Sequence, residues 1–132
     1  MLKDKIYIIS RKKIEDNRGW FIKPLDGNEP NLSLRIGEVY VTVAAPKQSK
    51  GGDYSLKTNK WFTLVKGNAI LLLEDIETKE RMSIQLESRY PKTIFVPCKI
   101  ANIIQNNGED DCILVVYADK QYDMNDIIPY KL

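Results

Sequence analysis

The chain has 132 residues, 43% of them hydrophobic, and its 20 Lys and Arg against 18 Asp and Glu give a net charge of +2. This size suits one compact domain, residues 1–132, and the absence of any long block of one charge argues against a nucleic-acid partner. There is no histidine, which excludes imidazole acid–base chemistry and the commonest metal ligand.

The N-terminal residues, from Met1 to Lys5, carry charges from the third position onward, and no apolar run approaches the length that spans a membrane. Cys98 and Cys112 are too few to form the disulfide framework of a small secreted protein. We therefore expect a cytoplasmic protein with neither a signal peptide nor a membrane anchor.

Short β-rich runs, separated by polar or glycine-containing turns, follow one another along the chain with little helical periodicity. The strand candidates, in chain order, are residues 6–9, 35–43, 60–65, 69–73, 82–86, 93–96 and 112–117. Their spacing predicts an all-β sandwich or barrel, and a small jelly roll accommodates it.

Several local patterns refine this prediction. Gly67 lies between two strand candidates and can adopt a positive φ, so we predict a hairpin there. Residues 24–30 and 106–111 have the composition of loops or turns. In residues 38–43, three valines share one face while Tyr40 and Thr42 share the other, and one face is expected to be core. The run 70–73 is expected to be covered on both sides.

Residues 60–67 resemble the first motif of the cupin superfamily. In metal-binding cupins this motif contains a His-x-His pair, then a Glu, then a Gly, and those places correspond here to Asp53 and Ser55, Lys60 and Gly67. The glycine is present and the ligands are not.

Residues 97–106 resemble the second cupin motif, in which a Pro, a His and an Asn correspond here to Pro97, Asn102 and Asn106. Lys60 would repel a metal, and Ser55 and Asn102 are poor replacements for imidazole. The resemblance implies a cupin-type double-stranded β-helix, or jelly roll, with no metal and no other cofactor.

A closer resemblance, spread over most of the chain, is to the metal-free cupins that process nucleotide sugars. These are the dTDP-4-dehydrorhamnose 3,5-epimerases and the dTDP-4-keto-6-deoxyhexose 3,4-ketoisomerases. The matching segments are residues 16–21, 37–42, 50–54 and 122–126. The resemblance implies a ligand of the nucleotide-sugar class.

This resemblance also implies catalytic roles. Asp53 stands where the family has a histidine base that removes a proton next to a ketone, Lys60 where a lysine stabilises the developing enolate, and Tyr117 where a tyrosine acts as acid. Removal of such a proton needs a base and a cation or donor facing the oxygen, and carboxylates also perform it.

Substrate-binding roles follow from the same resemblance. Arg18 matches an arginine that contacts the diphosphate, often across a dimer interface, and Lys50 takes the place of another arginine. Ser55 and Asn102 are expected to contact the substrate. Asn106 is expected to bond the local backbone instead. The resemblance also implies a homodimer, in which the apolar run 6–9 offers an edge to cover.

Simpler interpretations of the catalytic candidates stay open. Asp53 follows two glycines and could be a turn carboxylate, Lys60 could be a solvated charge on a strand, and Tyr117 ends an apolar run and could be a core aromatic. Cys98 is assigned no role because no histidine can activate it.

Three functions are therefore open. The first is a metal-independent epimerase or ketoisomerase that acts on a dTDP- or UDP-linked 4-keto-6-deoxyhexose in surface-polysaccharide or deoxysugar synthesis. The second is a catalytically silent cupin that binds a sugar nucleotide, and the third is a cupin that only oligomerises. Fold alone does not decide between them.

Overall fold

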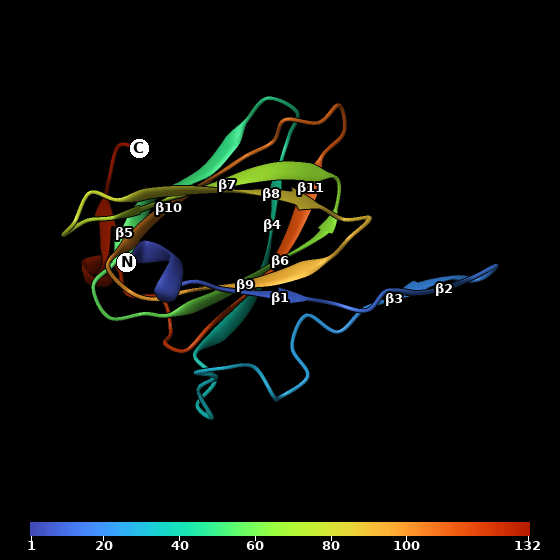
Figure 1. Cartoon of the computed structure of the whole chain (residues 1–132), viewed down its shortest axis with the longest axis horizontal. Coiled ribbons are helices and arrows are strands. Elements are labelled where there is room, and N and C mark those ends of the chain that lie inside the picture. The colour runs from blue at the N-terminus through green and yellow to red at the C-terminus, as the bar shows by residue number, and fades with distance from the viewer.

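In the computed structural model, which describes residues 1–132, two five-stranded antiparallel sheets face each other and a two-stranded hairpin projects away from them (Figure 1). The first sheet contains, in spatial order, β1 (Tyr7–Ser10), β9 (Lys92–Val96), β6 (Lys60–Lys66), β11 (Cys112–Ala118) and β4 (Glu38–Ala44). The second contains β12 (Ile127–Pro129), β5 (Ser49–Ser55), β10 (Ile100–Gln105), β7 (Asn68–Asp75) and β8 (Arg81–Glu87). The predicted all-β, jelly-roll-type fold is confirmed.

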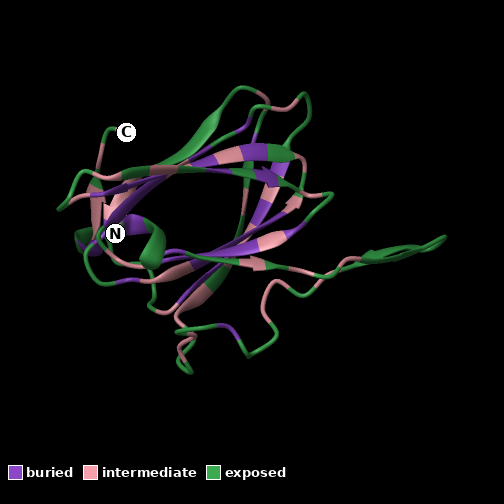
Figure 2. Cartoon of the chain, in the orientation of Figure 1, coloured by how far each residue is buried: buried purple, intermediate pink, exposed green.

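The remaining elements lie outside these sheets. The hairpin is formed by β2 (Ile14–Asp16) and β3 (Gly19–Phe21), and every residue of both strands is exposed (Figure 2). Two single-turn 3-10 helices complete the chain, η1 (Leu2–Asp4) at the N-terminus and η2 (Met124–Asp126) before β12. No helix has both the length and the apolar character needed to cross a membrane.

The main core lies between the two sheets. Alternate residues of the inner strands, such as Leu71 and Leu73 on β7 and Leu114 and Val116 on β11, are fully buried there. The run 70–73 is less enclosed than expected, because Ile70 and Leu72 lie on the outer face of the second sheet and are only partly buried. Inward and outward side chains therefore alternate along this strand, and only the inward ones enter the core, even though the residues are apolar on both faces.

The predicted hairpin at Gly67 is wrong, although its backbone conformation was anticipated correctly. Gly67 has a φ of 91°, but β6 belongs to the first sheet and β7 to the second. The chain turns a corner between sheets here, as strands do in sandwiches. A Cβ atom on Gly67 would lie 3.0 Å from the Asp111 carbonyl oxygen, so the corner needs glycine.

Strand β4 presents its valines outward. Val39, Val41 and Val43 are 58%, 63% and 43% exposed, while Tyr40 faces inward and packs against the main core. Because β4 is the edge strand of the first sheet, its inner face borders an open end of the sandwich, where a polar-tipped tyrosine can reach water.

A second, smaller core covers the outer face of the first sheet. Trp61, Phe95 and Tyr117 pack together there, with Leu25 and Leu32 from the loop that precedes β4 lying against them. The buried ion pair between Arg11 and Glu29 at 3.0 Å ties this loop to the end of β1. The loop predicted at residues 24–30 is therefore confirmed, and it packs against the outer face of the first sheet instead of extending into solvent.

Candidate functional site

A cavity of about 380 Å³ opens between the two sheets at the end where η2 lies. Such a volume lies within the range of small-molecule sites. Both sheets and two loops contribute to its walls. The lining residues are Glu38 and Tyr40 from β4, Asp53 and Ser55 from β5, Lys60 from β6, Ile127 from β12, Thr58, and residues 120–123 and 126.

A β-bulge in β5 places Asp53 in this cavity. Asp53 pairs with Asn102 and Gly51 pairs with Ile103, which leaves Gly52 as the extra residue. Gly51 and Gly52 have φ values of 100° and 85°, and a Cβ atom on Gly51 would lie 2.9 Å from the Asn102 carbonyl oxygen. Bulges commonly re-aim a side chain beside a site. The two glycines thus allow the bulge that turns Asp53 inward.

The electrostatics of Asp53 suit a base. Burial raises the pKa of its carboxyl above the usual range, and the Lys60 ammonium partly opposes that rise. No hydrogen bond from the protein contributes to this balance. The carboxylate is therefore half-buried, close to a cation, and available to a ligand.

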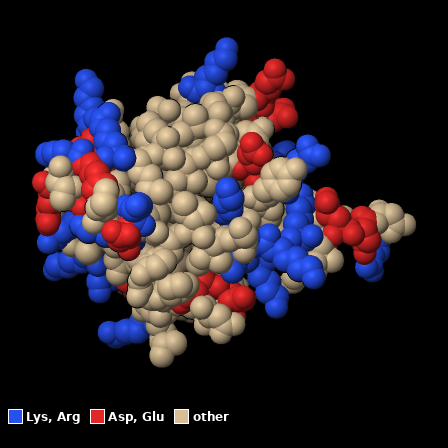
Figure 3. Space-filling view, in the orientation of Figure 1, with Lys and Arg blue, Asp and Glu red and all other residues tan.

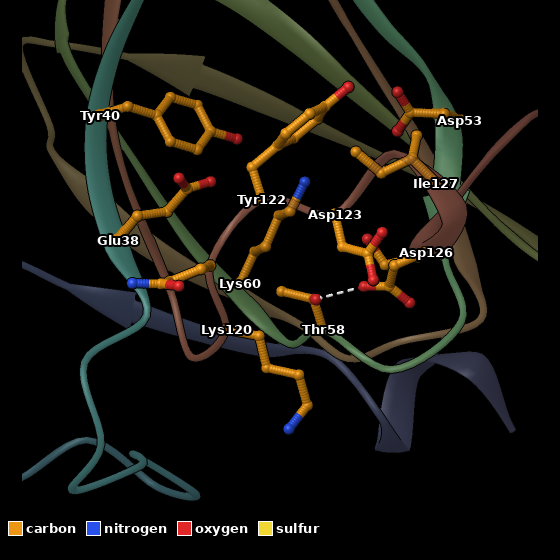
Figure 4. A pocket seen from close by; sticks show the side chains of 12 residues that line it. Glu38, Tyr40, Asp53, Thr58, Lys60, Lys120, Tyr122, Asp123, Asp126 and Ile127 are labelled. Atoms are coloured by element: carbon orange, nitrogen blue, oxygen red, sulfur yellow. Dashed lines mark hydrogen bonds between the residues drawn. The ribbon is translucent and has the colours of Figure 1, made fainter.

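Tyr40 and Asp53 enter the cavity from opposite walls, and in Figure 4 the Tyr122 ring and the Lys60 ammonium both lie between them. Burial raises the pKa of Tyr40 to about 12, with further contributions from the negative charges of Glu38 and Asp53. At neutral pH the Tyr40 hydroxyl keeps its proton, so it can donate a hydrogen bond or a proton. The arrangement brings together a carboxylate, an ammonium and a phenol.

Asp126 also lines the cavity, but its carboxylate is occupied. It accepts hydrogen bonds from the Thr58 hydroxyl at 2.5 Å and from the Lys57 backbone N–H at 2.8 Å. Figure 4 shows the first of these bonds at the edge of the cavity. Asp126 therefore shapes the wall rather than offering a free carboxylate.

Of the residues expected from the sequence, Asp53, Lys60 and Ser55 are brought together in this cavity. Tyr117 is not. Its side chain lies on the outer face of the first sheet, where its hydroxyl is 3.1 Å and 3.0 Å from the carbonyl oxygens of Ser33 and Arg35. Neighbouring residues of a strand point to opposite faces, and Tyr117 occupies the outward position.

The other expected contacts also lie away from the cavity wall. Asn102 is buried beside Asp53 in the register of the sheet, and Lys50 is exposed on β5. Arg18 lies at the tip of the β2–β3 hairpin, where its side chain is 87% exposed and pairs with Asp16 at 2.6 Å. Asn106 bonds the backbone of Ala44 and other neighbouring residues, as expected.

Sequence reasoning did not assign the cavity roles of Tyr40, Glu38 and Tyr122. Tyr40 and Glu38 fall in the segment 37–42, and Tyr122 in the segment 122–126, both of which carry the family resemblance. The sequence therefore marked these two segments but not the individual residues that enter the cavity. Naming Glu38 and Tyr40 required knowing which face of β4 turns inward, and naming Tyr122 required knowing the path of the segment between β11 and η2.

The Cys, Asp and Glu side chains do not gather in groups of three or more that could hold a metal ion. The carboxylates of the cavity are accompanied by Lys60 and Lys120. That the protein works without metal stays a prediction.

The family model described as "Polysaccharide biosynthesis C-terminal domain" matches residues 14–128. No curated protein sequence matches the chain. The similarity to solved structures is strong in shape and weak in sequence.

Three solved structures illustrate this similarity. A dTDP sugar isomerase from Desulfovibrio desulfuricans has 15% identity and a TM-score of 0.86, and the match covers 94% of this chain and 82% of that one. The 3,4-ketoisomerase QdtA from Thermoanaerobacterium thermosaccharolyticum, as a variant in complex with TDP-4-keto-6-deoxyglucose, has 22% identity, coverage of 94% and 86%, and a TM-score of 0.76.

The third is the capsular polysaccharide assembling protein CapF from Staphylococcus aureus, with 19% identity and a TM-score of 0.70. The match covers 92% of this chain but only 34% of CapF. At these identities the three structures establish the shared cupin-type fold.

Proposed function

This chain belongs to the family of polysaccharide biosynthesis C-terminal domains, and from that membership we propose that it is a metal-independent epimerase or ketoisomerase of nucleotide-linked 4-keto-6-deoxyhexoses. The observation that carries the proposal is the convergence of Asp53, Lys60 and Tyr40 on one cavity. The solved relatives that share the fold include enzymes that act on dTDP sugars.

The proposed reaction begins with removal of the proton from the carbon next to the ketone, C3 or C5, by the Asp53 carboxylate. The electron pair of the broken C–H bond forms the enolate, whose oxygen becomes negative and faces the Lys60 ammonium. For epimerisation, Tyr40, on the opposite wall, returns a proton to the same carbon from the other face. The tyrosinate then regains a proton from water, and the protonated Asp53 releases its proton to water. A base, a cation at the oxyanion and an acid are the groups that this chemistry requires.

Tyr40 thus takes the acid role that the sequence resemblance gave to Tyr117. The Tyr117 hydroxyl already bonds two backbone carbonyl groups beneath the loop before β4. The Tyr40 hydroxyl lines the cavity. Both phenols keep their protons at neutral pH, since burial raises the pKa of each, so position alone favours Tyr40.

The nucleoside diphosphate is proposed to lie outside the cavity. The cavity volume of about 380 Å³ suits a sugar ring, and the cavity wall contains four carboxylates against two ammonium groups. The carboxylates are Glu38, Asp53, Asp123 and Asp126, and the ammonium groups are Lys60 and Lys120. A diphosphate would be repelled by this excess of carboxylates. The anion therefore needs cations from elsewhere, and the exposed Arg18 is the proposed source.

Arg18 would reach a site by way of a homodimer. The hairpin that carries it projects from the body of the protein (Figure 1) and exposes Ile14, Trp20 and Phe21. The outward valines of β4 form a second uncovered apolar surface. Apolar surfaces of this kind mark protein interfaces, and a second copy that covers both would bring its own hairpin to the partner. The nucleotide, the homodimer and the cytoplasmic location all stay proposals.

The test is proton NMR of dTDP-4-keto-6-deoxyglucose in deuterated buffer with and without the protein. Deuterium uptake at C3 or C5 beyond the protein-free rate, or formation of a 3-keto isomer, is expected. Asp53→Asn should abolish the uptake, while Asp123→Asn, which changes an exposed carboxylate of the same cavity, should keep most of it. Uptake that survives in Asp53→Asn would remove Asp53 from the mechanism.

A second candidate, favoured by the absence of histidine, is a catalytically silent sugar-nucleotide binder. An ordinary carboxylate, with a reference pKa of about 3.9, is a weaker base than imidazole. Broadened ligand resonances without any deuterium uptake would identify this second function. If neither line broadening nor deuterium uptake is seen, the third possibility, a cupin that only oligomerises, is favoured.

A further inference from the structure

The segment 119–126, which connects β11 to β12, forms one wall of the cavity and is held almost entirely at its two ends. Between them, residues 120–125 are all exposed, although residues 120–123 line the cavity. The hydrogen bonds that this middle part makes are local, from the backbone of Asn125 and Asp126 to Asp123. Its position over the cavity therefore depends on its anchors.

Both anchors are carboxylates that bind the same loop, residues 56–59. At the first end, Asp119 accepts hydrogen bonds from the backbone N–H and the side-chain amide of Asn59, each at 2.9 Å. At the second end, Asp126 accepts from Lys57 and Thr58 with its carboxylate and from the Leu56 N–H, at 2.9 Å, with its carbonyl oxygen. Hydrogen bonds at both ends of the segment 119–126 thus connect it to the loop 56–59.

Each end has a further support beside its carboxylate. Gly37 lies so close to the backbone of Lys120 that a Cβ atom there would be 2.2 Å from it, and the Gly37 N–H donates to Ala118. The second end relies on Asp126, whose side chain is buried. Charge-assisted bonds to a buried carboxylate are stronger than neutral ones, and Asp126 immediately precedes β12, which pairs with the strand that carries Asp53.

We propose that Asp126 is a positioning residue, which holds the segment 120–125 across the cavity so that Tyr122 covers a bound ligand. Tyr122 is exposed, and its ring lies beside Lys60 in the cavity view (Figure 4). The occupied Asp126 carboxylate acts through this segment and not on the ligand. That the ligand is a nucleotide sugar rests on the function proposed above, whereas the anchoring does not.

The first experiment needs no ligand. Hydrogen–deuterium exchange of the intact protein is compared for wild type, Asp126→Asn and Asp75→Asn. Asp75 is the matched control, since it is a buried carboxylate that accepts backbone bonds from Glu77 and Thr78 and lies outside the segment. Asp126→Asn is expected to speed exchange in residues 56–59 and 119–126 about tenfold, the effect of losing one charge-assisted bond.

Asp75→Asn should speed exchange in the turn between β7 and β8 and near Lys5, whose ammonium the Asp75 carboxylate also binds at 2.6 Å, and should leave residues 56–59 and 119–126 unchanged. Unchanged exchange of residues 56–59 and 119–126 in Asp126→Asn would overturn the proposal. So would an equal effect of Asp75→Asn on those residues, because the result would then reflect a general loss of stability.

The second experiment measures the affinity for dTDP-4-keto-6-deoxyglucose. Thr58→Val, which removes the hydroxyl that bonds Asp126 and keeps its volume, should weaken binding about tenfold, and Thr58→Ser should restore wild-type affinity. Equal affinity of Thr58→Val and wild type would overturn the role of the anchor in binding. Failure of the wild type to bind this probe would count against the proposed function alone, and the exchange experiment would still decide the anchoring.

Discussion

At the residue scale, the proposal that Asp53 is the base has a consequence for pH dependence. Such a base must be ionised, and burial raises the pKa of Asp53 above its ordinary value of 3.8. The rate of deuterium uptake is therefore expected to fall as the pH falls through that raised pKa. As the pH falls, a histidine base would be protonated earlier, near its own pKa of about 6.5, and its activity would already be lost there.

Lys60→Met tests the coupling between the two groups. The Lys60 ammonium lowers the pKa of Asp53, so its removal should shift the acid side of the rate profile to higher pH. The maximal rate should also fall roughly 100-fold, since the enolate oxygen loses its cation. An acid side that stays in place in this variant would show that Asp53 is not the titrating base.

Tyr40→Phe separates proton removal from proton return. Asp53 still removes and returns a proton on its own side of the sugar, so deuterium uptake should persist, while inversion of the carbon should slow about 100-fold or more, the usual contribution of a general acid. NMR distinguishes uptake from inversion in one sample. The expected epimeric product at an undiminished rate would argue against Tyr40 as the acid.

Tyr117→Phe is the matched control for that experiment. The change removes a hydroxyl that bonds Ser33 and Arg35, so it should lower the free energy of unfolding by about 1 kcal/mol and leave both uptake and inversion unchanged. Selective loss of inversion in Tyr117→Phe would instead return the acid role to Tyr117.

At the scale of elements, the bulge in β5 controls the site. Gly51→Ala would place a Cβ atom 2.9 Å from the Asn102 carbonyl oxygen at a φ of 100°. We expect a loss of about 1–3 kcal/mol in the free energy of unfolding, measured with urea, because both strain and crowding oppose the change. Deuterium uptake should fall with it, since Asp53 moves.

Gly27→Ala, in the loop before β4, is the control for Gly51→Ala. Gly27 also has a positive φ, of 94°, but a Cβ atom there would meet nothing within 4 Å. Its replacement should cost about 1 kcal/mol from strain alone and leave uptake unchanged. A Gly51→Ala variant that behaves like Gly27→Ala would show that the bulge does not hold the base.

The sequence predicted seven of the twelve strands, and all seven candidates are found. The strands β2, β3, β5, β10 and β12 were not predicted, although β10, with the sequence IANIIQ, is as apolar as several strands that were. The strand β5, with the sequence SKGGDYS, has the least strand-like composition of these. The glycines of β5 disfavour a strand locally, and only pairing with β10 and β12 stabilises it. That pairing joins distant parts of the chain and is not visible in a local pattern.

The same limit applies within the candidate site. Motif spacing marks Asp53, Ser55 and Lys60, which line one cavity, and their roles there stay predictions. Tyr117 was misplaced because β11 alternates apolar residues on both faces, Leu114 and Val116 inward and Val115 and Tyr117 outward. With apolar residues on either side, alternation fixes which residues share a face but not which face is inside.

At the scale of the whole molecule, charged side chains are interspersed toward both ends and are sparse in the middle of the face drawn in Figure 3. A net charge of +2 gives no strong field of either sign. Association is therefore expected to depend on the exposed apolar surfaces of β4 and the hairpin rather than on electrostatic steering.

Val41→Lys tests that expectation. Val41 is 63% exposed in the single chain, so a lysine there should leave the melting temperature of the monomer almost unchanged while it disrupts a dimer. Light scattering should give a dimer for the wild type and a monomer for the variant. Ser83→Lys, on the exposed outer face of the other sheet, should stay dimeric. A monomeric wild type would contradict the proposed interface.

The exposed hairpin also makes the protein spectroscopically informative. The chain has two tryptophans, which differ in exposure. Trp61 is 1% exposed, under the loop before β4, and Trp20 is 50% exposed, on β3. The Lys13 ammonium lies 4.9 Å from the centroid of the Trp20 ring. Any event that covers the hairpin would change the emission and the quenching of Trp20 and leave those of Trp61 almost untouched. The intrinsic fluorescence of this chain therefore reports on its most exposed element without an added label.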